Sequence, residues 1–69
     1  MYFKDKWGDK IPFKITTERD GGVTTYVCHI NPWGDAWHPY ASGRTRRRAV
    51  IEAKHDWEND RITNHVALT

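Results

Sequence analysis

The 69-residue sequence lacks most of what disulfide-rich, zinc-binding and membrane proteins require. Its one cysteine, Cys28, allows no intrachain disulfide and no cysteine pair of the zinc-binding kind. No apolar run is nearly as long as a membrane span, which needs about eighteen residues. The first six residues also lack the apolar core of a signal peptide. We expect a cytoplasmic chain, encoded as a complete short open reading frame, that folds as one small domain with a thin core.

Residues for catalysis and metal binding are also scarce. The single serine, Ser42, lacks the glycines of a nucleophile elbow, and no glycine-rich phosphate loop is present. Cys28 falls on the apolar side of an expected strand, which favours a core cysteine over a nucleophile. His29 points to the opposite face, and His29 facing His38 across a hairpin would supply only two metal ligands. We expect no enzyme activity, no metal and no cofactor.

Aromatic residues and one basic segment stand out instead. Four tryptophans, three tyrosines and two phenylalanines exceed the aromatic content of disordered chains and predict a folded domain. The formal net charge is only +2, but residues 36–50 contain four arginines and no acidic residue. Residues 51–60 contain four acidic residues against one lysine. Such a concentrated basic site indicates more about partners than the total charge does.

Alternation of apolar and polar residues predicts an antiparallel sheet. Residues 11–18 alternate with a period of two, and a Gly-Gly turn separates them from the β-branched and aromatic residues 23–30. A proline–glycine turn then leads to a third strand at residues 36–41, which Pro39 restricts to an edge of the sheet. We expect a three-stranded meander with residues 23–30 in the middle.

Helical spacing follows the predicted strands. Ser42 or Thr45 is expected to cap a helix of about fifteen residues that ends at Asn59 and Asp60. The apolar stripe of this helix should pack on one face of the sheet. The stripe consists of Ala49, Val50, Ala53 and Trp57.

The predicted fold is therefore α+β, with a three-stranded antiparallel meander packed on one C-terminal helix in the order βββα. Residues 1–10 contain aromatic side chains before a Gly-Asp pair, and we expect them to form an extra edge strand or a flap. Residues 61–69 alternate again, and we expect a short C-terminal strand or a tail there.

Two signals predict a binding surface. Four arginines should lie at the start of the helix, where cations oppose the helix dipole but where free amides attract phosphate. They are Arg44, Arg46, Arg47 and Arg48. A solvated helix end with an Arg48–Glu52 pair, or an acidic protein partner, also explains them. Just upstream, four ring side chains suit base stacking and a protein hot spot equally well. They are Trp33, Trp37, His38 and Tyr40.

The junction between sheet and helix resembles a known family. The run GRTRRRAVIEA at residues 43–53, with the strand TYVC at residues 25–28, is similar to lambda-type integrase arm-binding domains. This resemblance covers about residues 23–58 and implies a three-stranded sheet that enters the DNA major groove. It implies that the four arginines hold phosphates and that exposed strand residues reach base edges. Those strand residues are Thr25, His29 and His38.

The same Gly-x-Thr…Ala…Glu-Ala pattern also resembles HicB-type antitoxins and folds related to double-stranded-RNA-binding domains. By size, the chain is similar to small phage and mobile-element inhibitors, such as anti-CRISPR proteins, that block a host machine by surface contact. We expect a non-enzymatic nucleic-acid-binding module, with duplex DNA as its first partner. The alternative is a protein-binding inhibitor of an acidic or nucleic-acid-binding host protein, or a HicB-like antitoxin.

Overall fold

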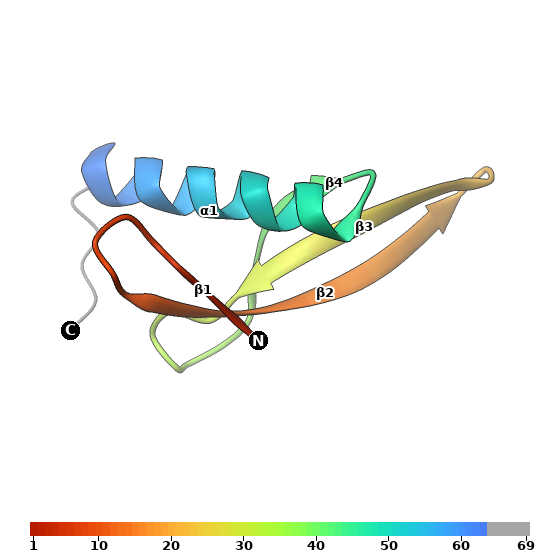
Figure 1. Ribbon diagram of the computed structural model, residues 1–69. Coiled ribbons are helices and arrows are strands. Elements are labelled where there is room, and N and C mark those ends of the chain that lie inside the picture. Colours follow the sequence, from red (N-terminus) through yellow and green to blue (C-terminus); the bar gives the residue numbers. More distant parts are fainter. Residues whose placement is uncertain (64–69) are drawn as a thin grey trace.

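The computed structural model describes residues 1–63 as a four-stranded antiparallel sheet with one helix on one face (Figure 1). The elements are β1 Tyr2–Lys4, β2 Lys10–Asp20, β3 Val23–Ile30, β4 His38–Gly43 and α1 Arg46–Thr63. The strands form a meander in the order β1-β2-β3-β4, and α1 packs mainly on β3 and β4. The α+β class, the meander and the C-terminal helix are confirmed, and the expected extra N-terminal strand is β1.

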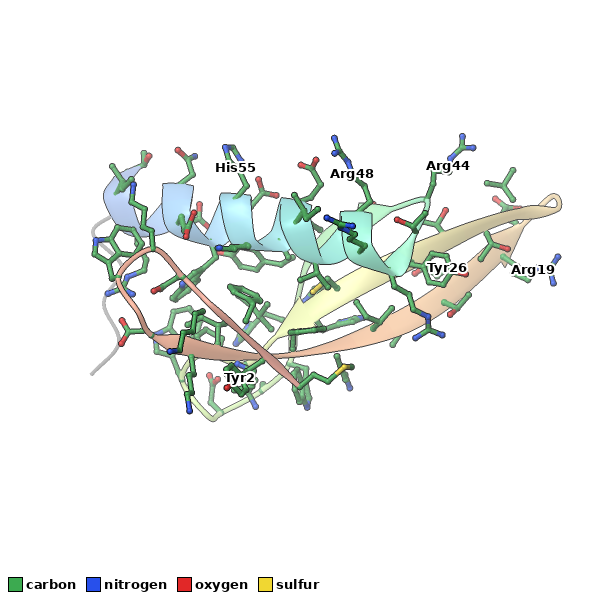
Figure 2. All side chains as sticks on the ribbon, viewed as in Figure 1. Tyr2, Arg19, Tyr26, Arg44, Arg48 and His55 are labelled. Atoms are coloured by element: carbon green, nitrogen blue, oxygen red, sulfur yellow. The ribbon has the colours of Figure 1, made fainter. Side chains whose placement is uncertain are left out.

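The first residues of β2 pair with β1, and the rest of β2 pairs with β3. Phe3 of β1 lies opposite Ile11 of β2, and both are buried against the helix side. Tyr2, one residue away, lies on the other face of the sheet (Figure 2). The core is formed by side chains from β1, β2, β3 and α1. These are Phe3, Ile11, Cys28, Ile30, Ala49, Ala53 and Trp57.

β4 is an edge strand, as Pro39 predicted, but it begins at His38, two residues later than expected. Its pairing with β3 shifts between Cys28 and His29. Tyr40 is the extra residue of this β-bulge, because neither neighbour in β3 lies opposite it. The bulge reverses which residues of β4 face the helix.

The start of α1 is close to its predicted position. Thr45 rather than Ser42 is the cap, because its Oγ1 accepts a hydrogen bond from the backbone N–H of Arg48 at 3.0 Å. The Thr45 carbonyl accepts a second bond from the backbone N–H of Ala49 at 3.1 Å. Gly43 is required just before this turn, since a Cβ there would lie 2.9 Å from the backbone nitrogen of Ala49. The absence of a side chain at Gly43 thus allows the first helical turn to lie close to β4.

The predicted end of the helix at Asn59 and Asp60 is wrong, because α1 continues to Thr63. The predicted strand or tail is therefore also wrong for residues 61–63, and its remaining part, residues 64–69, lies outside the described residues. Contacts with the β1–β2 turn stabilise the additional helical residues.

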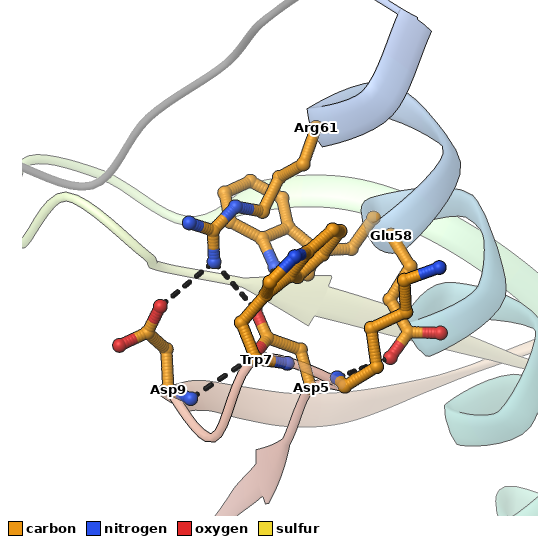
Figure 3. A network of polar contacts seen from close by, with 7 residues as sticks. Asp5, Trp7, Asp9, Glu58 and Arg61 are labelled. Atoms are coloured by element: carbon orange, nitrogen blue, oxygen red, sulfur yellow. Dashed lines mark hydrogen bonds and ion pairs between the residues drawn. The ribbon is translucent and has the colours of Figure 1, made fainter.

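A buried carboxylate makes these contacts (Figure 3). Asp5 follows β1, and its side chain is completely buried. Its Oδ2 accepts hydrogen bonds from Trp57 Nε1 at 3.0 Å and from Arg61 Nη1 at 2.8 Å. Its Oδ1 accepts bonds from the backbone N–H groups of Trp7 and Asp9. Four donors offset the cost of burying this charge, so the Asp5 side chain is structural.

Further contacts surround the carboxylate. Arg61 also pairs with Asp9 at 2.8 Å, and its guanidinium lies 4.5 Å from the centroid of the Trp7 ring. The backbone N–H of Lys6 donates to Glu58 Oε2 at 2.6 Å. We call this group of side chains the Asp5 network. It consists of Asp5, Trp7, Asp9, Trp57 and Arg61.

Removal of Trp57 should unfold the domain. Trp57 is completely buried and donates to Asp5, so Trp57→Ala should lower the free energy of unfolding by about 3–5 kcal/mol. Ile51, which is 45% exposed on the same helix, supplies the control, and Ile51→Ala should change it by less than about 0.5 kcal/mol. Thermal unfolding followed by circular dichroism measures both. A Trp57→Ala chain with near wild-type stability would contradict this helix register.

The pKa of Asp5 links the fold to pH. Burial raises this pKa, but the hydrogen bonds from Trp57, Asp9, Arg61 and Trp7 together outweigh burial and hold it below its usual value. A carboxyl group with a lowered folded-state pKa stabilises the fold above its unfolded-state pKa of about 3.9. That stability is lost as the pH falls through the folded-state pKa.

We therefore expect the wild type to lose stability progressively below about pH 4. Asp5→Asn should be less stable at neutral pH and should lose part of this acid dependence, whereas Asp20→Asn in the exposed β2–β3 hairpin should keep it. Urea unfolding across the acid range measures the difference. Parallel pH profiles for Asp5→Asn and the wild type would show that Asp5 is not the linked group.

Candidate functional site

The residues considered for chemistry lie apart. Within residues 1–63, no group of three or more His, Cys, Asp or Glu side chains is arranged to hold a metal ion. Cys28 is a core residue, as predicted: it is fully buried, and burial raises the pKa of its thiol to about 11. No helix in the described part of the chain has the length and apolar character to cross a membrane.

The two histidines of the sheet lie on opposite faces. His38 lies opposite Ile30, which faces α1, so the bulge places His38 on the helix side. His29 lies on the open face, where its Nε2 is hydrogen-bonded to Thr16 Oγ1 at 2.8 Å. The arrangement considered above, with His29 facing His38 across the hairpin, therefore does not occur. Of the strand residues that the family resemblance assigns to base edges, Thr25 and His29 share the open face and His38 does not.

The four predicted arginines are all exposed at the junction of β4 and α1. Figure 2 labels two of them, Arg44 and Arg48. Arg48 forms an ion pair with Glu52 one turn further along the helix, at 3.0 Å, as the solvated-helix interpretation predicted. Arg44 and Arg47 have no ion-pair, hydrogen-bond or ring partner among the described residues. At least two cations at this helix start are thus uncompensated within residues 1–63.

The β2–β3 hairpin extends beyond the start of α1 and adds residues that sequence reasoning missed (Figure 1). The guanidinium carbon of Arg46 lies 5.4 Å from the centroid of the Tyr26 ring on β3. Arg19 lies opposite Thr24, so strand alternation places it on the same face as Tyr26. Together these residues form what is called the arginine surface below. It consists of Arg19, Tyr26, Arg44, Arg46 and Arg47.

The predicted aromatic residues are not beside these arginines. Trp33 and Tyr40 pack edge-to-face against Trp57, with ring centroids 5.6 and 6.3 Å away. Trp57 follows Arg46 by three helical turns, which is about 16 Å along the axis. Tyr40 also donates its hydroxyl to Asp60, and burial together with that carboxylate raises the pKa of Tyr40. Tyr40 therefore extends the core, whereas Trp33 packs at its edge and stays 44% exposed. Neither ring stacks next to the arginines.

Trp37 lies on the other side of the sheet. The segment between β3 and β4 sends Trp33 to the helix side, whereas Trp37 contacts Lys14 of the open face, with Nζ 5.0 Å from the ring centroid. The two neighbouring tryptophans thus belong to different surfaces.

Comparison with protein-family models, with curated proteins and with solved structures finds no match for this chain. The resemblance to integrase arm-binding domains stays a hypothesis, so the surfaces of this chain carry the proposals below.

The burial of Cys28 has a simple chemical test. A thiol reagent such as dithiobisnitrobenzoate should not modify native Cys28 at neutral pH, because the thiol is inaccessible and its pKa is raised to about 11. Denaturant should expose it to full reaction. Ser42→Cys, at an exposed position of β4, should react at once in the native protein. Immediate modification of the native wild type would contradict the buried position.

Proposed function

We propose that this protein is a non-enzymatic nucleic-acid-binding domain that holds duplex DNA at the arginine surface. The supporting observation is a group of exposed cations at a helix N-terminus, of which Arg44 and Arg47 have no partner among the described residues. The helix dipole disfavours cations at this end, so the arrangement is costly for the isolated fold. A bound phosphate reverses that cost, because it meets both the helix N-terminus and the guanidinium groups.

The shape of this region supports an extended anionic partner. The β2–β3 hairpin continues the arginine surface past α1 and carries Arg19 (Figure 2). The Tyr26 ring contacts the guanidinium of Arg46, a planar group suited to two phosphate oxygens. A DNA backbone, with one charge per about 1.7 Å of duplex, can meet cations spread along such a surface.

The second candidate is a small inhibitor, of phage or mobile-element type, that binds an acidic or nucleic-acid-binding host protein. The exposed tryptophans Trp7, Trp33 and Trp37 favour it, since tryptophan and arginine are enriched in protein hot spots. A HicB-like antitoxin would use the same surface. In this second candidate function, the arginines bind carboxylates of the host protein.

The double variant Arg46→Ala, Arg47→Ala tests the proposal. It should weaken binding to duplex DNA of unrelated sequences to a similar extent and lower the salt slope of binding by about 2, one for each lost phosphate contact. Lys6→Ala, Lys54→Ala removes the same charge outside the arginine surface and should change the slope little. Fluorescence anisotropy of a labelled duplex at several salt concentrations gives the slopes, and circular dichroism checks the fold.

A folded double variant that binds duplex DNA as tightly as the wild type would mean that these arginines are only a solvated helix start. The proposal would then fail. If the wild type binds no duplex but captures a host protein, and the double variant does not, the inhibitor function replaces it.

A further inference from the structure

The face of the sheet away from α1 carries a second group of cations and rings. Strand alternation brings lysines from β1 and β2 to this face, next to a tyrosine of β1 and a tryptophan of the β3–β4 connection. Figure 2 shows Tyr2 on this side, opposite α1 and the labelled arginines of the helix start. We call this group the lysine face. It consists of Tyr2, Lys4, Lys10, Lys14, His29 and Trp37.

Its charges are arranged against the stability of the sheet. Lys4 and Lys10 are direct cross-strand partners, and like charges in that position repel. His29 lies opposite Lys14 and adds no negative charge. Among the open-face strand residues, the first carboxylate along β2 is Glu18, beyond the lysines. The pairing of Lys4 with Lys10 therefore lowers the stability of the sheet, whereas an anionic partner would neutralise its charges.

Its aromatic rings are available for stacking. Tyr2 is 53% exposed and Trp37 is 41% exposed, and neither belongs to the buried core. The ammonium nitrogen of Lys10 lies 4.9 Å from the centroid of Tyr2, and that of Lys14 lies 5.0 Å from the centroid of Trp37. A flexible lysine can leave the ring for a phosphate while a nucleobase takes its place. Rings alternating with cations are typical of surfaces that bind single strands.

We propose that the lysine face binds a single-stranded segment of nucleic acid, with bases stacked on Tyr2 and Trp37. Lys4, Lys10 and Lys14 hold the phosphates of that segment. A single strand fits this face better than a duplex, because unpaired bases can stack on side chains whereas paired bases stack on each other. The inference rests on the proposed nucleic-acid function, but it assigns a different form of nucleic acid to a different face.

The test compares a labelled oligothymidylate of about 15 nucleotides with a labelled duplex, by fluorescence anisotropy at several salt concentrations. Tyr2→Ala, Trp37→Ala should weaken oligothymidylate binding at least about tenfold with little change in salt slope, because stacking releases few ions. Tyr2→Phe, Trp37→Phe retains the flat rings and should recover most of the affinity.

Lys4→Gln provides a variant that does not endanger the fold. It removes the repulsion with Lys10, so its melting temperature should equal or exceed that of the wild type. Its salt slope for oligothymidylate should nevertheless fall by about 0.7, the value for one lost contact to a single strand. A higher stability together with weaker binding distinguishes a binding residue from a structural one.

The Arg46→Ala, Arg47→Ala variant separates the two proposals, since it should lose duplex affinity and keep oligothymidylate affinity. Lysine-face variants that bind oligothymidylate like the wild type, or a wild type that binds none, would overturn the lysine-face proposal and leave the duplex result to decide the proposed function. If the lysine-face variants lost as much affinity for duplex as for oligothymidylate, the lysine face would be a duplex surface. That result would also overturn the lysine-face proposal.

Discussion

The carboxylate of Asp5 is the contact on which the rest of the structure depends. It lies in the turn between β1 and β2, and it accepts hydrogen bonds from Trp57 and Arg61 near the end of α1. The core within residues 1–63 is thin, with seven buried apolar residues, and the sequence has no cysteine pair for a disulfide. The Asp5 network therefore joins the two ends of the described chain, and Gly43 allows the start of the helix to lie close to β4. Together they set how α1 crosses the sheet.

The position of α1 decides which side chains become surfaces. Because α1 covers one face, the lysines of β1 and β2 remain on an open one, and the arginines project where the helix begins. The same packing places Trp33 and Tyr40 against Trp57. Two basic surfaces result, one built on guanidinium groups and a helix N-terminus, the other on ammonium groups and flat rings. Their chemistry suits a duplex backbone and unpaired bases respectively.

Structural features that depend on residues close together in the sequence were predictable. Alternation located β2 and β3, and the two capping candidates Ser42 and Thr45, of which Thr45 is the cap, located the helix start to within a few residues. The helix end was not predictable, because the partners of Arg61 are more than fifty positions away in sequence. The bulge in β4, which turns His38 to the helix side, has no clear sequence signal. The arginines were found from charge alone, whereas the lysine face required the pairing of Lys4 with Lys10.

Chemical-shift mapping of the isotope-labelled protein tests most directly whether the two surfaces bind different forms of nucleic acid. Duplex DNA should shift the backbone amides of residues 44–47 and of Tyr26, and leave the indole signal of Trp37 unchanged. Oligothymidylate should shift the Trp37 indole and the amides of Lys10 and Lys14, and leave residues 44–47 unchanged. Shifts at the same residues with both ligands, or at neither surface with either ligand, would contradict the separation of the two surfaces.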